Sequence, residues 1–286
     1  MATYNAKTER LAAVNDAKGC TNFGAMAIDG MKAWALKSDG DGENAKSVLY
    51  YCSNVDTESE ATPYDDDGQV AKGLLGHGNG MTCNDNYLLF ACSGKQVVRV
   101  PRGFKADWDK AVIIETQTPV KKIAYYKPYK HIIWTDTLEA KNMQRFAIGT
   151  ITVNGKKGTM TNSDPFYVKT PEKYAHAQDI HYDTVKGLLF LTFNFRTYDY
   201  NTSKGELNNN EIWVYDLNVA SGTYEGCKLY SPRDIIKIDK RDNRSRYEIE
   251  SLGLDSNRKI VMACNIRVRG KNSDIDAFQR ITNITF

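Results

Sequence analysis

The feature that most constrains this chain is a pattern that recurs five times along it. Each copy consists of a short apolar stretch, a turn residue and then a second apolar or aromatic stretch. The copies occupy the following ranges: Gly24–Leu36, Gly80–Cys92, Lys122–Trp134, Asp179–Leu191 and Ser251–Ala263. Self-similarity of this kind is typical of architectures in which one structural unit is repeated around an axis or along a stack.

Aligning the copies on one apolar residue in each shows how regular the repeat is. These anchor residues are Met26, Met81, Ile123, Ile180 and Leu252. Three residues after the anchor, four of the five copies hold Asp or Asn, which favour a tight turn. Successive anchors lie 55, 42, 57 and 72 residues apart, and the path from the last anchor through both termini to the first adds 60. A unit of about 40 to 60 residues built from strands has the size of a propeller blade.

Residue types between the anchors favour strands over helices. The chain has 17 Tyr, 10 Phe and 4 Trp, mostly beside Val, Ile and Thr, and this is strand chemistry. Thr8–Ala17 is the one stretch with a helical start. Further strands are expected at Gln96–Val100, Arg145–Ile148, Glu211–Tyr215 and in a hairpin over Thr150–Thr159 that turns at Asn154–Gly155. The sequence therefore predicts an all-β fold, a single closed β-propeller with five blades, with a pair of β-sandwiches as the alternative.

Closure and domain organisation follow from the two ends of the chain. Gln279–Phe286 reads as a strand at the C-terminal end, and the N-terminal residues are expected to complete the same blade. Such closure protects strands that an open propeller would leave as edges. We therefore expect residues 1–286 to form one domain. With 286 residues, of which 41% are hydrophobic and 26% charged, the chain is long enough for a sizeable core.

Charge and hydropathy exclude some classes of partner. The net charge of +3 is too small to indicate a nucleic-acid partner, and no apolar run reaches the ~18 residues that a membrane span needs. The N-terminal residues lack the apolar core of a signal peptide. We therefore expect a cytoplasmic protein, or one released by a route that needs no signal.

The cysteines are expected to be reduced and structural. Six Cys in 286 residues are too few for a disulfide scaffold, and their spacing is not that of a zinc site. Cys92 and Cys264 lie at nearly equivalent places in their copies of the repeat, where Thr135 and Thr192 stand in two others. The repeat therefore predicts that a small buried side chain packs at that place, and a cysteine thiol meets this requirement.

The residues just before each anchor carry the candidate chemistry. In a propeller this stretch opens the innermost strand, whose side chains face the central channel. The residues two and four positions before the anchors are Asn79 and His77, Lys121 and Pro119, Gln178 and His176, Glu250 and Glu248, and Gly24 and Asn22. Alternation along a strand places each pair on one side. The pattern predicts a ring of imidazole, amide, ammonium and carboxylate groups that converge on one central pocket.

Roles within this ring depend on what the protein does. In an enzyme, His77, His176 and Glu250 would be catalytic, whereas Asn79, Lys121, Gln178 and Glu248 would bind the ligand. Polar channel residues also serve in propellers to fill the channel with hydrogen bonds to each other and to water. The two other histidines, His131 and His181, fall in strand or turn positions and are expected to be structural.

A divalent cation is the cofactor that the sequence suggests, through two different groups. Asp39 and Asp41 resemble the start of a calcium loop, but the glutamate that would end the loop is absent, so a tight hairpin turn is the simpler interpretation. Glu248 and Glu250 stand on one strand face at roughly 6 to 7 Å. They suit either a general acid and base pair or cation ligands.

Three short stretches resemble a known family. Gly76–Thr82, His176–Asp183 and Tyr247–Asp255 are similar to the innermost strands of the helveticin J-like family, propeller-type proteins of Gram-positive bacteria and their phages that are related to bacteriocins. The resemblance covers about a tenth of the chain. Asn22–Ala25 and Pro119–Lys122 depart from it, because they lack the His or Glu. The resemblance implies binding to a cell surface or glycan, without a defined set of catalytic residues.

The residues favour two main classes of function. Amide and imidazole groups with many Tyr and Trp favour a recognition module that binds a glycan or small polar ligand at the mouth of the channel. The mixture of imidazoles with carboxylates favours instead a propeller enzyme, a metal-assisted or acid–base hydrolase, lyase or isomerase that uses the same ring. A scaffold for protein interactions is a third class. The residues leave binding and catalysis open, and they favour neither a monomer nor an oligomer.

Overall fold

The computed structural model describes residues 1–40, 42, 44–64, 74–92, 96–102, 108–138, 141–171, 175–197, 206–239, 244–268 and 275–286. Within these ranges the secondary structure is almost entirely strand, with one short 3-10 helix, η1 (Trp108–Lys110). The predicted all-β class is confirmed. Among these residues no helix is long and apolar enough to cross a membrane.

Most described strands belong to four-stranded antiparallel meanders, which we number in chain order. The first has β3 (Asn22–Asp29), β4 (Lys32–Ser38), β5 (Ser47–Cys52) and β6 (Thr62–Pro63), and the second has β7 (Gly80–Cys83), β8 (Tyr87–Ala91), β9 (Gln96–Pro101) and β10 (Val112–Thr116). The third has β11 (Lys122–Lys127), β12 (Lys130–Leu138), β13 (Met143–Asn154) and β14 (Lys157–Lys169). The fourth has β15 (Ala175–Asp183), β16 (Leu188–Thr197), β17 (Glu206–Asp216) and β20 (Asp234–Asp239), and the fifth has β21 (Arg244–Leu254), β22 (Ile260–Val268), β23 (Ala277–Ile281) and β2 (Thr8–Ala13).

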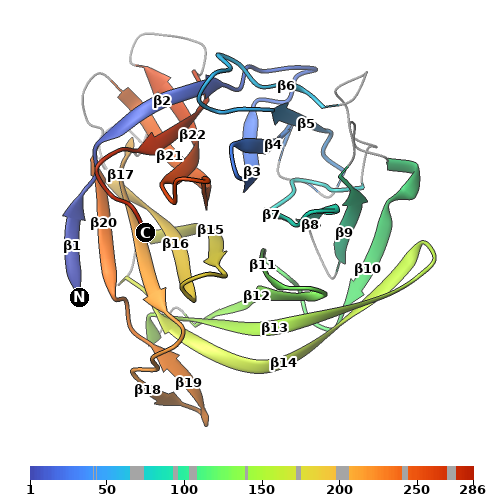
Figure 1. Cartoon of the computed structure of the whole chain (residues 1–286), viewed down its shortest axis with the longest axis vertical. Coiled ribbons are helices and arrows are strands. Elements are labelled where there is room, and N and C mark those ends of the chain that lie inside the picture. The colour runs from blue at the N-terminus through green and yellow to red at the C-terminus, as the bar shows by residue number, and fades with distance from the viewer. Residues whose placement is uncertain are drawn as a thin grey trace.

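The first strand of each meander faces the middle of the molecule. Figure 1 shows β3, β7, β11, β15 and β21 around the centre, with the later strands of each meander towards the periphery. Each first strand contacts the first strands of the meanders on either side, and β21 contacts β3. This is a propeller-like arrangement, and it places the starts of all these strands together.

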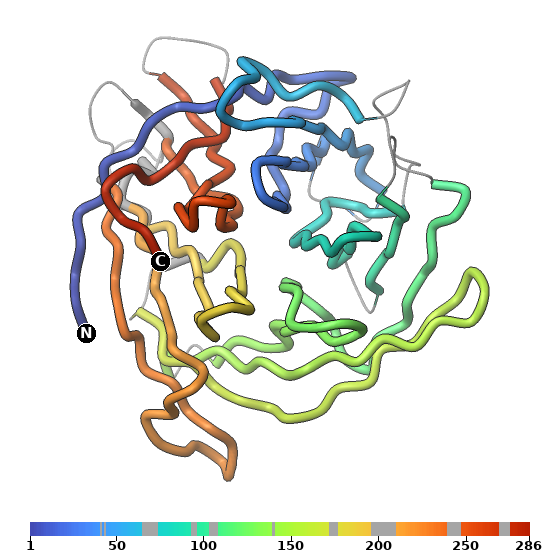
Figure 2. Tube along the Cα trace, in the orientation of Figure 1, coloured from blue at the N-terminus to red at the C-terminus, as the bar shows by residue number. Residues whose placement is uncertain are grey.

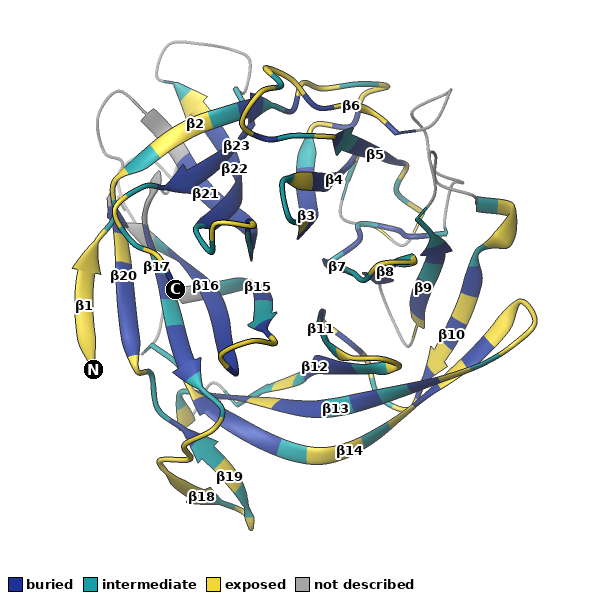
Figure 3. Cartoon of the chain, in the orientation of Figure 1, coloured by how far each residue is buried: buried dark blue, intermediate teal, exposed yellow. Residues whose placement is uncertain are grey.

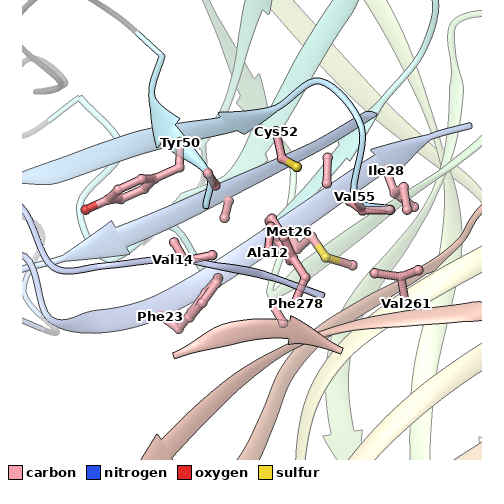
Figure 4. Close-up of a cluster of buried hydrophobic side chains, with 14 of the residues drawn as sticks. Ala12, Val14, Phe23, Met26, Ile28, Tyr50, Cys52, Val55, Val261 and Phe278 are labelled. Atoms are coloured by element: carbon pink, nitrogen blue, oxygen red, sulfur yellow. The ribbon is translucent and has the colours of Figure 1, made fainter. Parts of the chain in front are cut away.

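The repeat anchors are core residues that pack between meanders. Each anchor is at most 2% exposed and belongs to a different hydrophobic cluster of the described residues. In the cluster around Met26, drawn in Figure 4, side chains of the first meander meet Val261 and Phe278 of the fifth. The rings of Phe23 and Phe278 stand edge to face with centroids 6.4 Å apart. In Figure 3 most strands of the meanders are largely buried, whereas exposed residues mark β1 (Ala2–Asn5), β2, the tip of the β13–β14 hairpin and several turns.

The N-terminal stretch is strand and not helix. Thr8–Ala13 forms β2, which pairs antiparallel with β23, so that Thr8 faces Ile281. The helical start expected over Thr8–Ala17 is therefore wrong, because hydrogen bonds from a distant strand decide its conformation. The tube in Figure 2 shows the two ends of the chain on the same side of the molecule. The C-terminal strand is shorter than expected and ends at Ile281.

Additional strands cover outer edges of the meanders. β1 (Ala2–Asn5) runs parallel to β20. β14 pairs in parallel with β10 through one part of its length and with β19 (Cys227–Tyr230) through another, and β18 (Gly222–Tyr224) pairs with β19. These pairings satisfy backbone groups that an uncovered edge strand would expose.

Two local expectations in the third meander are refined. β13 is continuous from Met143 to Asn154, so the strand predicted at Arg145–Ile148 and the following hairpin are one element. The hairpin is present, but Asn154 pairs with Lys157, so the two loop residues are Gly155 and Lys156. Gly155 has φ of +60°, a conformation that favours glycine.

The cysteines agree with the sequence prediction. Cys92 and Cys264 are buried thiols outside any disulfide. Burial raises the pKa of the Cys92 thiol to about 12, so this sulfur stays protonated and unreactive at neutral pH.

Candidate functional site

The first strands are bulged near their starts, and the bulges decide which side chains meet. In β15 the register shifts between Ala177 and Ile180, so that Gln178 and Asp179 both face Thr192, whose hydroxyl oxygen accepts a hydrogen bond from the Asp179 N–H at 2.9 Å. In β21 the shift falls between Ile249 and Ser251, which makes Glu250 the extra residue. A bulge re-aims side chains and breaks the alternation of a regular strand.

The other first strands share this irregularity. In β3 the register shifts across Gly24. Asn79–Gly80 both pair with Ala91, and Lys121–Lys122 both pair with Trp134. Because each bulge adds one residue between the anchor and the position four residues earlier, the alternation assumed from the sequence does not hold there. The residue directly before the anchor can therefore join the residues two and four positions before it.

A buried charged cluster results, to which the third, fourth and fifth meanders contribute. We call it the central cluster, and its members are Lys122, Gln178, Asp179, Glu248 and Glu250. Its charged residues are each 9% exposed or less. Lys122 donates from Nζ to the backbone oxygen of Asn79. Burial lowers the pKa of Lys122, and the charges of Asp179 and Glu250 oppose that shift.

Asp179 is the most deeply buried acid of the cluster. It is 1% exposed, and its Oδ2 accepts a hydrogen bond from the Ser251 hydroxyl. Among the described residues, no donor reaches its Oδ1. Burial raises the pKa of Asp179 to about 7, although Lys122 and the Ser251 hydroxyl favour its ionised form. An aspartate with such a pKa exchanges its proton near neutral pH.

Glu248 and Glu250 form the other acidic part of the cluster. The amide of Gln178 donates to Oε1 of Glu248 at 2.9 Å, and that of Asn194 donates to the same oxygen at 3.3 Å. The amide of Asn265 donates to Oε1 of Glu250 at 2.7 Å. Burial and then the charge of Glu248 raise the pKa of Glu250 well above its usual range. A carboxyl group with a raised pKa is a candidate for proton transfer to or from a bound group.

The two histidines of the predicted ring are placed differently. His77 precedes β7, and its Nδ1 lies 3.1 Å from the Ser38 hydroxyl and 3.2 Å from the Gly40 oxygen. These contacts hold the ring against the first meander. His176 pairs with Asn194 in the backbone register of β15. Its side chain lies outside the described part of the chain.

Lys121 differs from the predicted convergence, whereas Asn79 reaches the central cluster through its backbone oxygen. Lys121 is exposed, and its Nζ lies 5.8 Å from the centroid of the Trp134 ring and donates to the Thr137 hydroxyl at 3.4 Å. Lys122, the next residue, reaches the cluster in its place. Asn79 contributes its backbone oxygen to Lys122.

The suggested cation positions receive no support from the described residues. Asp39 accepts the N–H of Lys46 at 2.7 Å, which closes a hairpin turn. Asp41 lies outside the described residues. Within the described ranges, no group of three or more His, Cys, Asp and Glu side chains is arranged to hold a metal ion.

Sequence reasoning missed Lys122, Asp179 and Ser251, all directly before an anchor. It also missed Asn194 and Asn265, which lie on second strands. One signal was available for the first group, because a lysine and an aspartate directly before a buried apolar anchor are unusual. For the two asparagines no local signal exists, since their role depends on the neighbouring strand.

A separate cavity of about 370 Å³ lies at the other end of the first strands. Its lining includes His181, Asp183 and Arg258. Arg258 donates to the Asp183 carboxylate, and burial lowers the pKa of His181 to about 4. The middle of the molecule is therefore polar at both ends, with anchor side chains such as Met26 and Leu252 lining the inner wall of this cavity.

No protein-family model and no curated protein matches the chain. Among solved structures, glutaminyl cyclase from Myxococcus xanthus is similar, with a TM-score of 0.53 and 7% identity over 98% of this chain and 100% of that chain. A GH43 protein from Bacillus licheniformis has a TM-score of 0.50 and 9% identity over 98% of this chain and 60% of that chain. An arabinanase from Bacillus subtilis has a TM-score of 0.49 and 10% identity over 95% of this chain and 96% of that chain. At these identities the likeness concerns the fold alone, and it makes this chain an all-β protein with a propeller-type fold.

Proposed function

We propose that the five meanders are the blades of one closed propeller spanning residues 1–286. We further propose that the protein binds a carbohydrate or another small polar ligand where the first strands begin. The blade count is supported by the contacts of each first strand with its two neighbours around the centre. Closure is supported by the pairing of β2 with β23.

The observation that carries the binding proposal is the convergence of three meanders on the central cluster. Lys122, Asp179 and Glu250 come from three different first strands and are buried. Burying charged groups together costs free energy, and clusters of this kind are common at binding and catalytic sites. Carboxylates and amides accept and donate hydrogen bonds to hydroxyl groups, and acids outnumber bases here, which suits a neutral polyhydroxylated ligand. One protein of similar fold is a GH43 protein, and the ligand class itself rests on the chemistry of the central cluster.

The test is a binding screen with matched variants. Purified protein is applied to an array of neutral oligosaccharides, and the strongest hit is titrated by calorimetry. Glu248→Gln replaces the carboxyl group of the cluster by an amide, and Gln178→Ala removes the amide that donates to Glu248. Each change should weaken binding by about tenfold or more, as expected when a ligand loses a strong hydrogen-bond partner. Glu60→Gln, an exposed acid outside the cluster, is the control and should bind normally.

Thermal melting separates a binding role from a structural one. The cluster variants should keep their melting midpoints within a few degrees of the parent protein. Unchanged affinity in both cluster variants, or absence of any binder on the array, would reject the proposal.

A second candidate is acid–base catalysis on the same ligand, and one specific observation favours it. Glu250 has a pKa raised well above its usual range next to Glu248, and Asp179 titrates near neutrality. Carboxyl groups whose pKa values are raised by burial are common acids and bases in hydrolases and isomerases.

Turnover of nitrophenyl glycosides across pH 4–9 tests the catalytic candidate. If the protein is an enzyme, Glu250→Gln should lower kcat by about 100-fold, the usual contribution of one proton-transfer group. Glu60→Gln should leave kcat unchanged. Oligosaccharides that bind tightly and are recovered intact after long incubation would leave binding as the function.

The natural partner of the protein is a further part of the proposal. The resemblance of three first-strand segments to the helveticin J-like family leads us to propose a cell-surface glycan as the partner. Binding to whole Gram-positive cells, competed by the array hit and lost in Glu248→Gln, is the measurement that checks it.

A further inference from the structure

A second cleft lies between two hairpin turns, away from the central cluster. It has a volume of about 170 Å³ and is lined by the β7–β8 turn, the β11–β12 turn and neighbouring strand residues. The side chains that matter are Tyr87, Arg99, Tyr125, Tyr129 and His131. A cavity of about 150 Å³ holds one benzene molecule, so this cleft has room for a single six-membered ring.

His131 is a buried polar side chain without a hydrogen-bond partner. It is 2% exposed, and among the described residues neither of its ring nitrogens has a partner. The Tyr125 ring stands edge-on to it, with centroids 5.9 Å apart. Burial lowers the pKa of His131 to about 4, so the ring is neutral at pH 7 and has one donor and one acceptor to offer. Leaving such groups unpaired costs stability, and packing alone does not require a histidine here.

Arg99 is a cation without a described acid to pair with. Its guanidinium carbon lies 4.2 Å from the centroid of the Tyr87 ring. Its buried Nε has no acceptor among the described residues, and none of the ion pairs within that part of the chain includes Arg99. Asp85, the acid in the lining, is exposed. A carboxylate entering the cleft would give Arg99 the charge-assisted bonds that it lacks.

Tyr129 adds a strained aromatic at the rim. It has φ of +62°, which is rare for a bulky side chain. It is also 69% exposed, so burial does not compensate for the strain. Strain of this kind is often kept where a side chain serves binding.

We propose that this cleft binds one sugar ring that carries a carboxylate, a uronic acid residue. The tyrosine rings would pack on the face of the sugar, as aromatic side chains do with apolar ring faces. Arg99 would pair with the carboxylate, and a hydroxyl beside His131 would give its ring nitrogens a partner. This site is distinct from the central cluster, and it does not depend on the function proposed for that cluster.

Calorimetry with D-glucuronate, D-glucose and benzoate tests the proposal. Glucuronate should bind with a Kd of about 1–10 mM, the range for a ligand of this size. Glucose, which lacks the carboxylate, and benzoate, which lacks the hydroxyls, should each bind about tenfold more weakly or not at all. Arg99→Met should reduce glucuronate affinity to the level of glucose. Arg145→Met, an exposed arginine on β13, is the matched control and should bind like the parent.

Three outcomes would overturn the proposal. Equal affinity for glucose and glucuronate would show that the carboxylate is not recognised. Equal affinity for benzoate and glucuronate would show that the sugar ring and its hydroxyls are not recognised. Loss of glucuronate binding in Glu248→Gln but not in Arg99→Met would place the ligand at the central cluster. Melting midpoints of both arginine variants, measured in parallel, establish that lost binding is not lost folding.

Discussion

At the scale of single residues, the carboxyl of Asp179 makes stability depend on pH. The pKa of an unfolded aspartate is 3.8, whereas burial raises the pKa of Asp179 in the folded chain to about 7. Between these values the folded state holds a proton that the unfolded state lacks. The free energy of unfolding therefore falls as pH rises through this window.

Asp179→Asn is expected to remove this dependence. The amide keeps an oxygen for the Ser251 hydroxyl but cannot ionise. Relative to the variant, the parent protein should lose on the order of a few kcal/mol of stability between pH 4 and pH 7, since each unit of pKa shift is worth ~1.4 kcal/mol. Urea unfolding of both proteins at pH 4.5, 6 and 7.5 measures the difference. If the free energies of unfolding of the two proteins differ by the same amount at all three pH values, the pKa of Asp179 is not raised.

A substitution at Tyr129 tests whether its backbone strain lowers stability while its ring contributes to ligand binding. Asn accepts positive φ more readily than Tyr, so Tyr129→Asn should raise the free energy of unfolding by about 0.5–1 kcal/mol. The same change should weaken glucuronate binding, because it removes one aromatic wall of the cleft. Denaturant unfolding and calorimetry give the two readouts. A variant that is less stable than the parent would mean that the exposed ring contributes packing.

At the scale of elements, the bulges at the starts of the first strands position the candidate site. Gly24 shows why the first meander has no side chain at the bulge of its first strand. A Cβ on Gly24 would lie 2.7 Å from the backbone oxygen of His77 and 3.0 Å from that of Gly78. The segment before β7 thus packs directly on β3, and only glycine allows that approach.

Gly24→Ala should therefore destabilise the protein by about 1–3 kcal/mol, the usual cost of forcing an extra methyl into a packed interface. Gly222→Ala is the matched control, because nothing lies within 4 Å of its added Cβ. The control should change stability by about 0.5 kcal/mol or less. Comparable midpoints for the two variants in urea would show that the 77–78 segment moves aside freely.

At the scale of the whole molecule, a buried lysine ties sequence-distant segments together. Lys37 on β4 is 0% exposed, and its Nζ donates to Asp276 at 2.8 Å and to the backbone oxygen of Val14 at 3.1 Å. It also pairs with Asp16. These bonds link the first meander to the fifth and to the N-terminal segment, next to the pairing of β2 with β23.

Lys37→Met is expected to cost about 3–5 kcal/mol, because it removes the buried ammonium that pairs with the Asp276 carboxylate. Lys32→Met, at the exposed start of the same strand, should cost about 0.5 kcal/mol or less. Adding Asp276→Asn to Lys37→Met should recover part of the loss. Chemical unfolding of the three variants measures these values. A small effect of Lys37→Met alone would mean that the segments are held by their apolar contacts.

Local patterns in the sequence were sufficient to establish the strand-rich class, the repeat and its core. The anchors Met26, Met81, Ile123, Ile180 and Leu252 are all buried, and each belongs to a separate cluster. Hydrophobicity, strand propensity and turn residues act over a few positions, so a single sequence displays them directly. The polar residues before the anchors were identified as chemistry-bearing for the same reason, and Gln178 and Glu248 do meet.

Tertiary structure decided which of those polar residues share one environment. When the partners of a strand are unknown, its side chains are expected to alternate between the two faces. Strict alternation places Lys121 and not Lys122 at the central site, and it leaves Asp179 out. The bulges reverse this choice, and they depend on pairing with residues such as Thr192 and Trp134 on neighbouring strands. The conformation of Thr8–Ala13 likewise depends on β23 at the other end of the chain. Such contacts join residues far apart in sequence, and their energies exceed local preferences, so the sequence determines the elements whereas packing determines the site.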